Sequence, residues 1–319
     1  MSRKSRILIY IIFVVFILIG FLVFFITKNQ METDSITFEN KKLQVVTTLF
    51  PLYDFSKNIG QDKVDVILLL PPGVEPHSFD PKPGDIIFIN NADIFIYTGK
   101  FMEPWAEDIL KSVANKNLLV VDASSGINLI SLAPEGQNKN TASIDPHIWL
   151  DFDNDKTIID LITAAFVKKD PKNKLFYEKN AEEYKSKLTE LDREYMSTLS
   201  YCKSKKIIYA GHYAFGYLVK RYGLEYIAVQ GLSPDAEPTA NDLINIINQI
   251  KENNIKYIFY EELSSPKIAE MLSKETGTKL LFLNPGANIS KEQLESGVTF
   301  ISIMKNNLEN LKIGLEYNQ

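Results

Sequence analysis

Eight short apolar runs, arranged in two groups of four, constrain the fold of this 319-residue chain more than any other feature. Strands that are buried on both faces read as continuous apolar runs, and their alternation with helical patterns is typical of parallel sheets. The sequence therefore predicts an α/β protein with two lobes, each with a parallel β-sheet flanked by helices. The predicted strands are Leu43–Leu49, Val64–Leu70, Ile94–Tyr97 and Leu118–Val121 in the first lobe, and the runs KIIYA, YIAV, KYIFY and KLLFL between Lys205 and Leu283 in the second.

The segment between the two groups predicts one long helix from Pro171 to about Leu199. Its apolar residues recur at spacings of three and four, with lysine and glutamate on the other faces. Proline is favoured in a first helical turn, and Asp170 is expected to cap it. At 1.5 Å per residue the helix would be roughly 40 Å long, so we expect a rigid strut between the lobes. The predicted parts are a first lobe at residues 43–170, a connecting helix at 171–200 and a second lobe at 201–319.

Residues 7–26 form an unbroken apolar run behind a basic flank at residues 1–6. A run of this length spans about 30 Å as a helix, and the basic flank is expected to stay in the cytoplasm. No small-residue cleavage pattern follows the run, and the single cysteine, Cys202, is far from it. We therefore predict an uncleaved transmembrane anchor with the body of the chain outside the membrane; an atypical signal peptide, removed after export, is the alternative. The polar residues 27–42 are expected to form a linker.

The charge of the chain gives no indication of a nucleic-acid partner. The formal net charge is −5, and removal of Arg3, Lys4 and Arg6 from the count gives −5 − 3 = −8. Proteins that bind nucleic acid carry a basic patch or stripe, which this composition does not provide. With 45% hydrophobic and 24% charged residues, the chain has the composition of a globular protein.

All three histidines lie in loops with neighbouring acidic, proline or glycine residues: His77 in GVEPHSFDP, His147 in SIDPHIWLD and His212 in YAGHYAFGY. His77 and His212 follow predicted strands, and open parallel sheets bind ligands outside the carboxyl ends of their strands. His147 precedes a helix that we expect to start near Lys156. Neutral imidazole is a common zinc ligand, so the three together indicate a metal site. Each histidine taken singly is better explained as an ordinary surface or core residue.

Side chains near the histidines could support such a site. A carboxylate can orient a ligand histidine through its second ring nitrogen, and the candidates are Asp80, Asp145 and Asp151. The alternative for these aspartates is turn or helix-cap chemistry, above all for Asp151. Four aromatic residues could wall the site or simply pack in the core: Phe79, Trp149, Tyr213 and Phe215.

Seven segments of the chain, in order from about Leu43 to Ile313, resemble the zinc- and manganese-binding solute receptors of bacterial ABC importers, the cluster A-I substrate-binding proteins. The resemblance implies two α/β lobes joined by a rigid helix, with one metal ion at the lobe interface. It also implies a receptor that delivers the ion to a membrane permease and its ATPase. The segments are VVTTLFPLYDFSKNIG, LLPPGVEPHSFDPKPGDI, NNADIFIYTGKFMEPWAEDI, DPHIWLD, IIYAGHYAFGYLVKRYGL, GLSPDAEPT and YIFYEELSSPKIAEMLSKETGTKLLFLNP.

The resemblance places His77, His147 and His212 at the histidine ligand positions of the family. In manganese receptors the position of His212 is typically a glutamate, so three histidines favour Zn²⁺ over Mn²⁺, as does the preference of zinc for nitrogen ligands. The fourth family ligand is commonly an aspartate, but Asn284 stands there. Glu261 is our predicted fourth ligand, with Asn284 or water as alternatives; Glu261 could equally be a helix-start acid. The loop before His147 also contains no histidine, and no lipidated cysteine follows the apolar run.

The predicted function is that of an extracytoplasmic, monomeric receptor that captures a metal ion and performs no catalysis. Binding requires neutral histidines, so the affinity is expected to fall below about pH 6.5. A secreted zinc-dependent hydrolase is the competing hypothesis, because three protein ligands plus water also describe a catalytic zinc site. The chain has no H-E-x-x-H motif, although Glu75 or Glu261 could serve as a general base. A metal-binding surface adhesin is the third possibility.

Overall fold

The computed structural model describes residues 19–21, 42–132, 143–232, 237–261 and 266–318. The predicted anchor at 7–26 and linker at 27–42 lie almost wholly outside these residues; Ile19–Phe21 is helical. Within the described part of the chain, no helix combines the length and the apolar character needed to cross a membrane. Residues Leu43–Gln319 form one compact unit, to which all further description applies.

Two four-stranded parallel sheets form the framework of this unit, and the eight predicted strands are confirmed. The strand order is β2-β1-β3-β4 in the first sheet and β6-β5-β7-β8 in the second. In both sheets the chain adds the second strand on one side of the first strand and the remaining two on the other side, so the strand order reverses at the equivalent place, beside β1 and beside β5. Ligands of such sheets bind where the order reverses, outside the carboxyl ends of the strands. The strands are β1 (Leu43–Thr47), β2 (Val64–Leu68), β3 (Ile94–Tyr97), β4 (Leu119–Asp122), β5 (Lys206–Ala210), β6 (Glu225–Ala228), β7 (Tyr257–Tyr260) and β8 (Lys279–Phe282).

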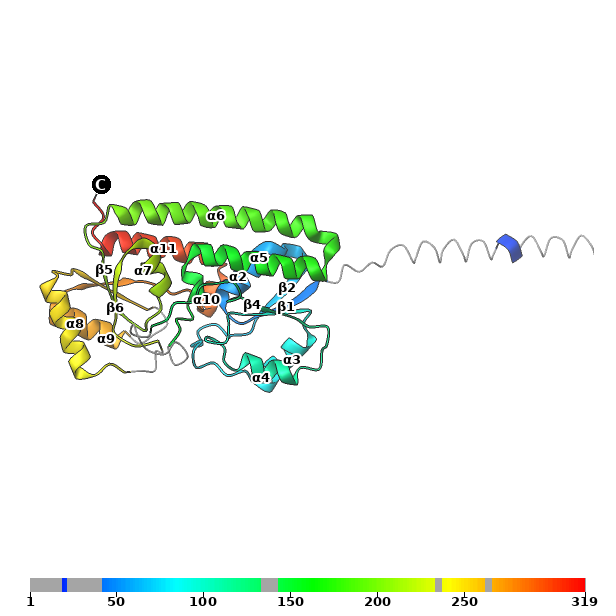
Figure 1. Ribbon diagram of the computed structural model, residues 1–319, viewed down its shortest axis with the longest axis horizontal. Helices are drawn as coiled ribbons and strands as arrows, with labels where there is room; N and C mark the ends of the chain where they lie inside the picture. Colours follow the sequence, from blue (N-terminus) through cyan, green and yellow to red (C-terminus); the bar gives the residue numbers. More distant parts are fainter. Residues whose placement is uncertain (1–18, 22–41, 133–142, 233–236, 262–265, 319) are drawn as a thin grey trace, which may run out of the picture. The chain divides into compact units, whose positions relative to one another are not determined.

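Helices cover both sheets, and one large apolar core extends through both lobes. Figure 1 shows the longest helix, α6, running past both sheets beside α5 and α11. The core is continuous because residues of both lobes pack against the same helices. The α-helices are α2 (Phe50–Gly60), α3 (Pro83–Asn91), α4 (Ala106–Ser112), α5 (Phe152–Lys169), α6 (Lys174–Ser200), α7 (Gly216–Tyr222), α8 (Ala240–Glu252), α9 (Lys267–Thr276), α10 (Lys291–Glu295) and α11 (Phe300–Gly314); the 3₁₀ turns are η1 (Gln61–Lys63), η3 (Ile148–Leu150) and η4 (Pro171–Asn173).

The predicted connecting helix is present, but its start differs from the expectation. Pro171–Asn173 forms the 3₁₀ turn η4, and α6 begins at Lys174. The expected backbone cap by Asp170 is wrong: its carboxylate accepts hydrogen bonds from Asn173 Nδ2 at 2.6 Å and from the Tyr177 hydroxyl at 2.7 Å. The 27 residues of α6 span about 40 Å. Its inward face is buried as predicted, through Tyr184, Leu188, Leu191, Tyr195 and Leu199.

The helix that follows His147 starts four residues earlier than expected, at Phe152 rather than near Lys156. The side chain of Asp151 accepts a hydrogen bond from the backbone N–H of Asp153 at 2.9 Å and so caps α5. Asp151 also receives a hydrogen bond from Arg221 of α7 at 2.8 Å. The helix-cap alternative for Asp151 is therefore the observed one.

Candidate metal centre

The structure brings the three histidines together, although they are 70 and 65 residues apart in the sequence. His77 lies in the loop after β2, His212 directly follows β5, and His147 immediately precedes η3. The Nε2 atom of His147 is 3.2 Å from Nε2 of His77 and 3.1 Å from Nε2 of His212. One nitrogen atom from each ring lies within 4.8 Å of the other two. Two of these loops leave the carboxyl ends of parallel strands, as the sequence predicted.

Two of the rings are buried and are oriented by carboxylates. His147 is 0% exposed, and its Nδ1 lies 2.8 Å from Asp145 Oδ1, which also accepts the backbone N–H of His147. His212 is 2% exposed, and its Nδ1 lies 3.0 Å from Glu261 Oε2. An ionised carboxylate only accepts hydrogen bonds, so when both carboxylates are ionised and both rings are neutral, each Nδ1 carries the proton and each Nε2 presents a lone pair to the centre. Asp145 therefore lies where it can orient a histidine ring, which is the role that the sequence suggested for it.

His77 is supported differently. Its ring is only partly buried, and among the described residues no carboxylate bonds to its Nδ1. Its backbone N–H donates to Glu75 Oε1 at 3.1 Å, so the glutamate fixes the loop and not the ring. Asp80, one of the three aspartates suggested to orient a ligand ring, is exposed and forms no hydrogen bond to any of the three rings. The suggestion that Asp80 orients a ligand ring is not supported by this geometry.

The surroundings shift the pKa values of the three rings in different directions. Burial, followed by the charges of the other two histidines, lowers the pKa of His77 to about 3. Burial lowers the pKa of His147 well below its usual range. Burial would also lower the pKa of His212, but the hydrogen bond and the charge of Glu261 outweigh it and raise that pKa above its usual value. His77 and His147 are therefore neutral near pH 7, which is the form that binds metal.

The spacing of the nitrogens fits a tetrahedral cation. With Zn–N bonds of about 2.0–2.1 Å and tetrahedral angles, ligand nitrogens lie about 3.3–3.4 Å apart. The two measured Nε2 to Nε2 distances, 3.2 and 3.1 Å, are close to that value. When all three rings are neutral and protonated at Nδ1, their Nε2 lone pairs face one point, where a cation can bind to them.

A small cavity of about 50 Å³ lies beside His212, bordered by Glu75, Glu261 and Asn284. It has room for one water molecule, whose share of liquid volume is about 30 Å³. Asn284 Oδ1 accepts the backbone N–H of Gly286 at 2.7 Å, and Glu261 Oε2 is bonded to His212. Two of the fourth ligands suggested by the sequence, Glu261 and Asn284, thus line the same small cavity, which has room for the third, a water molecule.

Aromatic residues near the histidines divide between the site and the core. The Trp149 ring meets the His147 ring edge to face, with centroids 5.4 Å apart, and its Nε1 donates to the carbonyl of Pro285 at 2.7 Å. Phe215 is fully buried against Tyr209, and Phe79 packs against Trp105, so both belong to the packing of their lobes. Trp149 is the aromatic residue of the four that borders a ligand ring.

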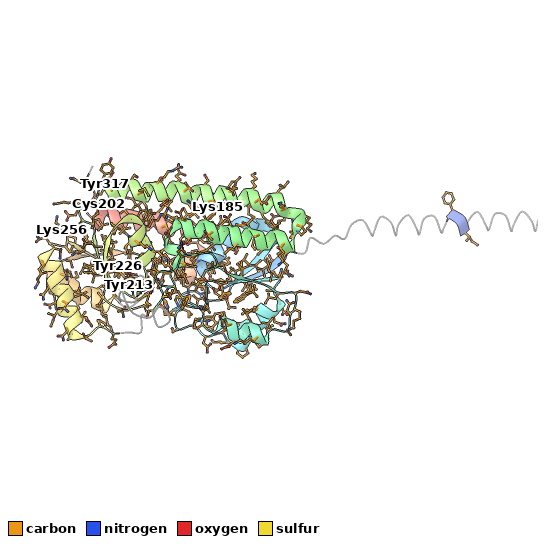
Figure 2. All side chains as sticks on the ribbon, in the orientation of Figure 1. Lys185, Cys202, Tyr213, Tyr226, Lys256 and Tyr317 are labelled. Atoms are coloured by element: carbon orange, nitrogen blue, oxygen red, sulfur yellow. The ribbon has the colours of Figure 1, made fainter. Side chains whose placement is uncertain are left out.

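Two residues that support the site were not found by reading the sequence. Tyr226 of β6 lies beside Tyr213 in Figure 2, with ring centroids 5.0 Å apart. Its hydroxyl donates to the His212 carbonyl and accepts the N–H of Ala214, both at 3.3 Å, which fixes the loop behind His212. The second residue, Asn288, bonds to the loop that carries His77. Neither residue stands in a pattern that a sequence could reveal.

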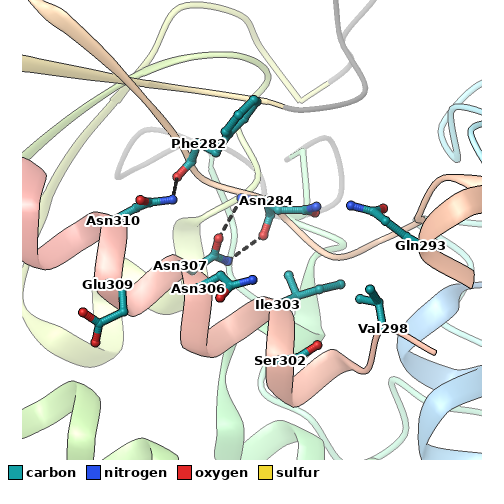
Figure 3. A pocket seen from close by; sticks show the side chains of 10 residues that line it. All are labelled: Phe282, Asn284, Gln293, Val298, Ser302, Ile303, Asn306, Asn307, Glu309 and Asn310. Carbon is teal, nitrogen blue, oxygen red and sulfur yellow. Dashed lines mark hydrogen bonds between the residues drawn. The ribbon is translucent and has the colours of Figure 1, made fainter. Parts of the chain in front are cut away.

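A larger cavity of about 350 Å³ lies between the end of β8 and α11 and contains none of the histidines. Figure 3 shows its amide-rich lining. There, Asn307 of α11 bonds to both backbone groups of Asn284: its Oδ1 accepts the N–H at 2.9 Å and its Nδ2 donates to the carbonyl at 2.7 Å. These bonds fix the backbone of the residue that stands at the expected fourth ligand position.

Comparison with known proteins gives one consistent result. Residues 45–314 match the family described as zinc-uptake complex component A, periplasmic. The high-affinity zinc uptake system protein ZnuA of Bacillus subtilis is 41% identical over 294 residues, covering 90% of this chain and 92% of that protein. The zinc-binding protein AdcA of Streptococcus pyogenes is 34% identical, and the match covers 85% of this chain but only 56% of the longer AdcA. The Zn(II)-bound structure of the ZnuA-like domain of Streptococcus pneumoniae AdcA has 36% identity and a TM-score of 0.75, covering 86% of this chain and 99% of that domain.

Proposed function

The chain belongs to the family of periplasmic zinc-uptake components, and from that membership we propose that it captures Zn²⁺ outside the cytoplasm for import by an ABC transporter. The family consists of binding receptors and not of enzymes, so the hydrolase alternative loses its basis. The observation that carries the proposal is the arrangement of the three Nε2 atoms, with separations of 3.2 and 3.1 Å that match those of ligand nitrogens around a tetrahedral zinc ion.

His77, His147 and His212 would bind zinc through Nε2, in the neutral form that the lowered pKa values of His77 and His147 already favour. A nitrogen-rich site suits Zn²⁺, whereas Mn²⁺ prefers oxygen ligands, so zinc is the proposed cargo and manganese the weaker competitor. Glu261 stays our predicted fourth ligand. Its Oε2 bonds to His212 Nδ1, so ligation requires the other oxygen or a rotation of the side chain; water in the small cavity or Asn284 are the alternatives.

The partners follow from the role of a receptor. We propose a membrane permease and its ATPase as the proteins that accept the ion, a monomeric receptor, and attachment to the outer face of the membrane through residues 7–26. Supporting the attachment are the length and apolar character of that run in the sequence. An acidic body with a net charge of −8 is compatible with the concentration of a cation at its surface.

Metal binding by the full-length protein in detergent micelles tests the proposal. After treatment with a chelator, the protein should bind one Zn²⁺ per chain, and Zn²⁺ should displace Mn²⁺ in competition. His147→Ala and His212→Ala should each weaken the binding, whereas substitution of an exposed residue away from the site, such as Lys111→Ala, should not. Preferential loading with Mn²⁺, or zinc binding that survives loss of two histidines, would contradict the proposal.

A further inference from the structure

The loop that carries His77 begins with a tight turn, Pro71-Pro72-Gly73-Val74. The N–H of Val74 donates to the carbonyl of Pro71 at 3.1 Å, and Gly73 has a φ of +79°. Proline in the second position and glycine with positive φ in the third are the pattern of a type II turn. The turn therefore moves as one rigid piece, and the position of His77 depends on what holds that piece.

One buried side chain of the second lobe holds the turn. Asn288 is 3% exposed, and its Nδ2 donates to the carbonyls of Pro71 and Val74, each at 2.8 Å. Its Oδ1 accepts the N–H of Ile289 at 2.8 Å, which fixes the orientation of the amide. The Gly73 N–H donates to the Ile289 carbonyl at 2.9 Å and adds a third bond between the turn and the second lobe.

Asn288 belongs to a segment, Asn284–Ile289, that is itself fastened on several sides; we call it the strap. Asn307 holds the backbone of Asn284 through two hydrogen bonds (Figure 3). Further along the strap, the carbonyl of Pro285 accepts the Trp149 indole N–H at 2.7 Å, and the carbonyl of Ala287 accepts the N–H of Phe50 at 3.1 Å. Because the strap has these additional anchors, we expect the turn to be the side of this contact that moves.

The small cavity beside His212 lies between the turn and the strap. Its lining comes from the turn side through Gly73, Val74, Glu75 and Pro76, and from the strap through Asn284, Pro285, Ala287 and Asn288. The buried residues His212 and Glu261 complete the lining. Movement of the turn away from the strap would widen this cavity into a passage to the metal centre, without any change in the distance between the two sheets.

We propose that Asn288 is a positioning residue that latches the turn at residues 71–74, and with it His77, over the metal centre, and that the ion enters and leaves between the turn and the strap. This inference rests on the proposed function as a zinc receptor. A latch of this kind controls the rates of capture and release more strongly than the affinity, because an open turn speeds both directions. Entry by this route also requires no large movement of the lobes, which α6 and the continuous core hold together.

The test compares zinc kinetics in the full-length wild type, in Asn288→Ala and in the matched control Asn180→Ala. Asn180 is also buried and also donates through Nδ2 to a backbone carbonyl, that of Ile59 at 2.9 Å, but it lies between α6 and α2. Stopped-flow mixing with an excess of chelator measures release, and mixing with Zn²⁺ measures capture. We expect Asn288→Ala to release zinc at least about tenfold faster, with faster capture and a smaller change in Kd than in the release rate; Asn180→Ala should leave both rates within twofold of the wild type.

Three outcomes would overturn the latch. They are a release rate within twofold of the wild type, faster release with an unchanged capture rate, and an equal acceleration in Asn180→Ala. Asn288→Asp keeps the size of the side chain but removes both donors, so it should accelerate release at least as much as alanine does. Failure of the wild type itself to bind one Zn²⁺ per chain would instead reject the proposed function.

Hydrogen exchange on the wild type provides a measurement that does not depend on the stability of a variant. The amide of Gly73, which donates to the strap, should exchange faster than the amide of Phe50, which donates to the same strap from α2. Zinc should slow the exchange of Gly73 because His77 then fastens the loop to the ion. Equal protection of the two amides in the metal-free protein, or no change at Gly73 on zinc addition, would contradict a mobile turn.

Discussion

His147 and His212 are held in the metal centre by other side chains, whereas His77 is held by its backbone. The first two are almost completely buried, and Asp145 and Glu261 fix their rings through Nδ1. His77 is partly buried, its ring has no carboxylate partner among the described residues, and its loop depends on the turn at 71–74 and on Asn288. For the proposed metal site, the comparison indicates two ligands that are already in position before the ion binds and a third, His77, whose position depends on its loop. A receptor needs both properties, since it must bind an ion selectively and must also release it.

Removal of one of the proposed histidine ligands should have the largest effect on zinc affinity, and the effect should differ between the buried pair and His77. Structural zinc sites have apparent binding free energies of roughly 10–16 kcal/mol, so one of four ligands accounts for roughly 2.5–4 kcal/mol, or about 70- to 900-fold in Kd. We expect His147→Ala to lose this much and His77→Ala to lose less, because ordering of the His77 loop on binding costs entropy. Chelator competition measures both values, and circular dichroism checks the fold. A greater loss for His77→Ala than for His147→Ala would break the comparison.

The pH dependence of zinc binding should come from His212 and Asp145 and not from His77 or His147. The pKa of His77 is about 3 and that of His147 is lower than usual, so neither ring competes for protons between pH 5 and 7.5. The pKa of His212 is raised, and burial raises the pKa of Asp145 to about 7, so the metal-free protein holds two protons there in mild acid. Zinc displaces the His212 proton and favours ionised Asp145. Because two protons are released, Kd should rise up to about 100-fold per pH unit below these pKa values.

Calorimetry in buffers of different ionisation enthalpy measures the number of protons released. Asp145→Asn removes one of the two titrating groups, so its Kd should change only about tenfold per pH unit. The expectation from the sequence, a fall in affinity below about pH 6.5, has the same sign and is now assigned to particular groups. An affinity that stays constant from pH 7.5 to 5 would contradict the assignment of the proton to His212.

A carboxylate that only orients a ligand ring should contribute less to zinc affinity than a ligand does. Loss of such an outer partner typically weakens metal binding by about 10- to 100-fold, and we expect this range for Asp145→Asn at pH 7.5. Glu261 is also our proposed fourth ligand, so Glu261→Gln should exceed this range and approach the loss of a histidine variant. Asp80→Asn is the matched control, because Asp80 is exposed and bonds to none of the three rings. If Glu261→Gln loses only about 10- to 100-fold in affinity, Glu261 orients His212 through Nδ1 and is not a direct ligand.

The sequence predicted much of this arrangement where a general rule connects pattern to structure. The eight strands were readable because they are buried as continuous apolar runs, and the ends of β2 and β5 placed His77 and His212 at one edge of their sheets. The place of His147 came from the resemblance, since its loop follows no strand end. Other contacts depend on side-chain conformations in the folded chain. Examples are the hydrogen bond between Glu261 and His212 and the two hydrogen bonds from Asn288 to a turn that begins 217 residues earlier in the sequence. No spacing or composition encodes such contacts.

A substitution at Asn284 should have the smallest effect and would show on which side the site is completed. Asn284→Asp keeps the acceptor for the Gly286 N–H and introduces a carboxylate, a better zinc ligand than an amide. We expect zinc affinity to rise by at most about tenfold, or ~1.4 kcal/mol, because the strap stays in place and only the fourth contact improves. Asn306→Asp adds the same charge at an exposed position of α11 that lines only the larger cavity, and it should leave the affinity unchanged. An equal gain in zinc affinity in both variants would show that the added negative charge alone causes the gain. A gain in Asn284→Asp alone would place the open coordination position between the paired histidines and the strap. That is the side on which His77 and its turn close.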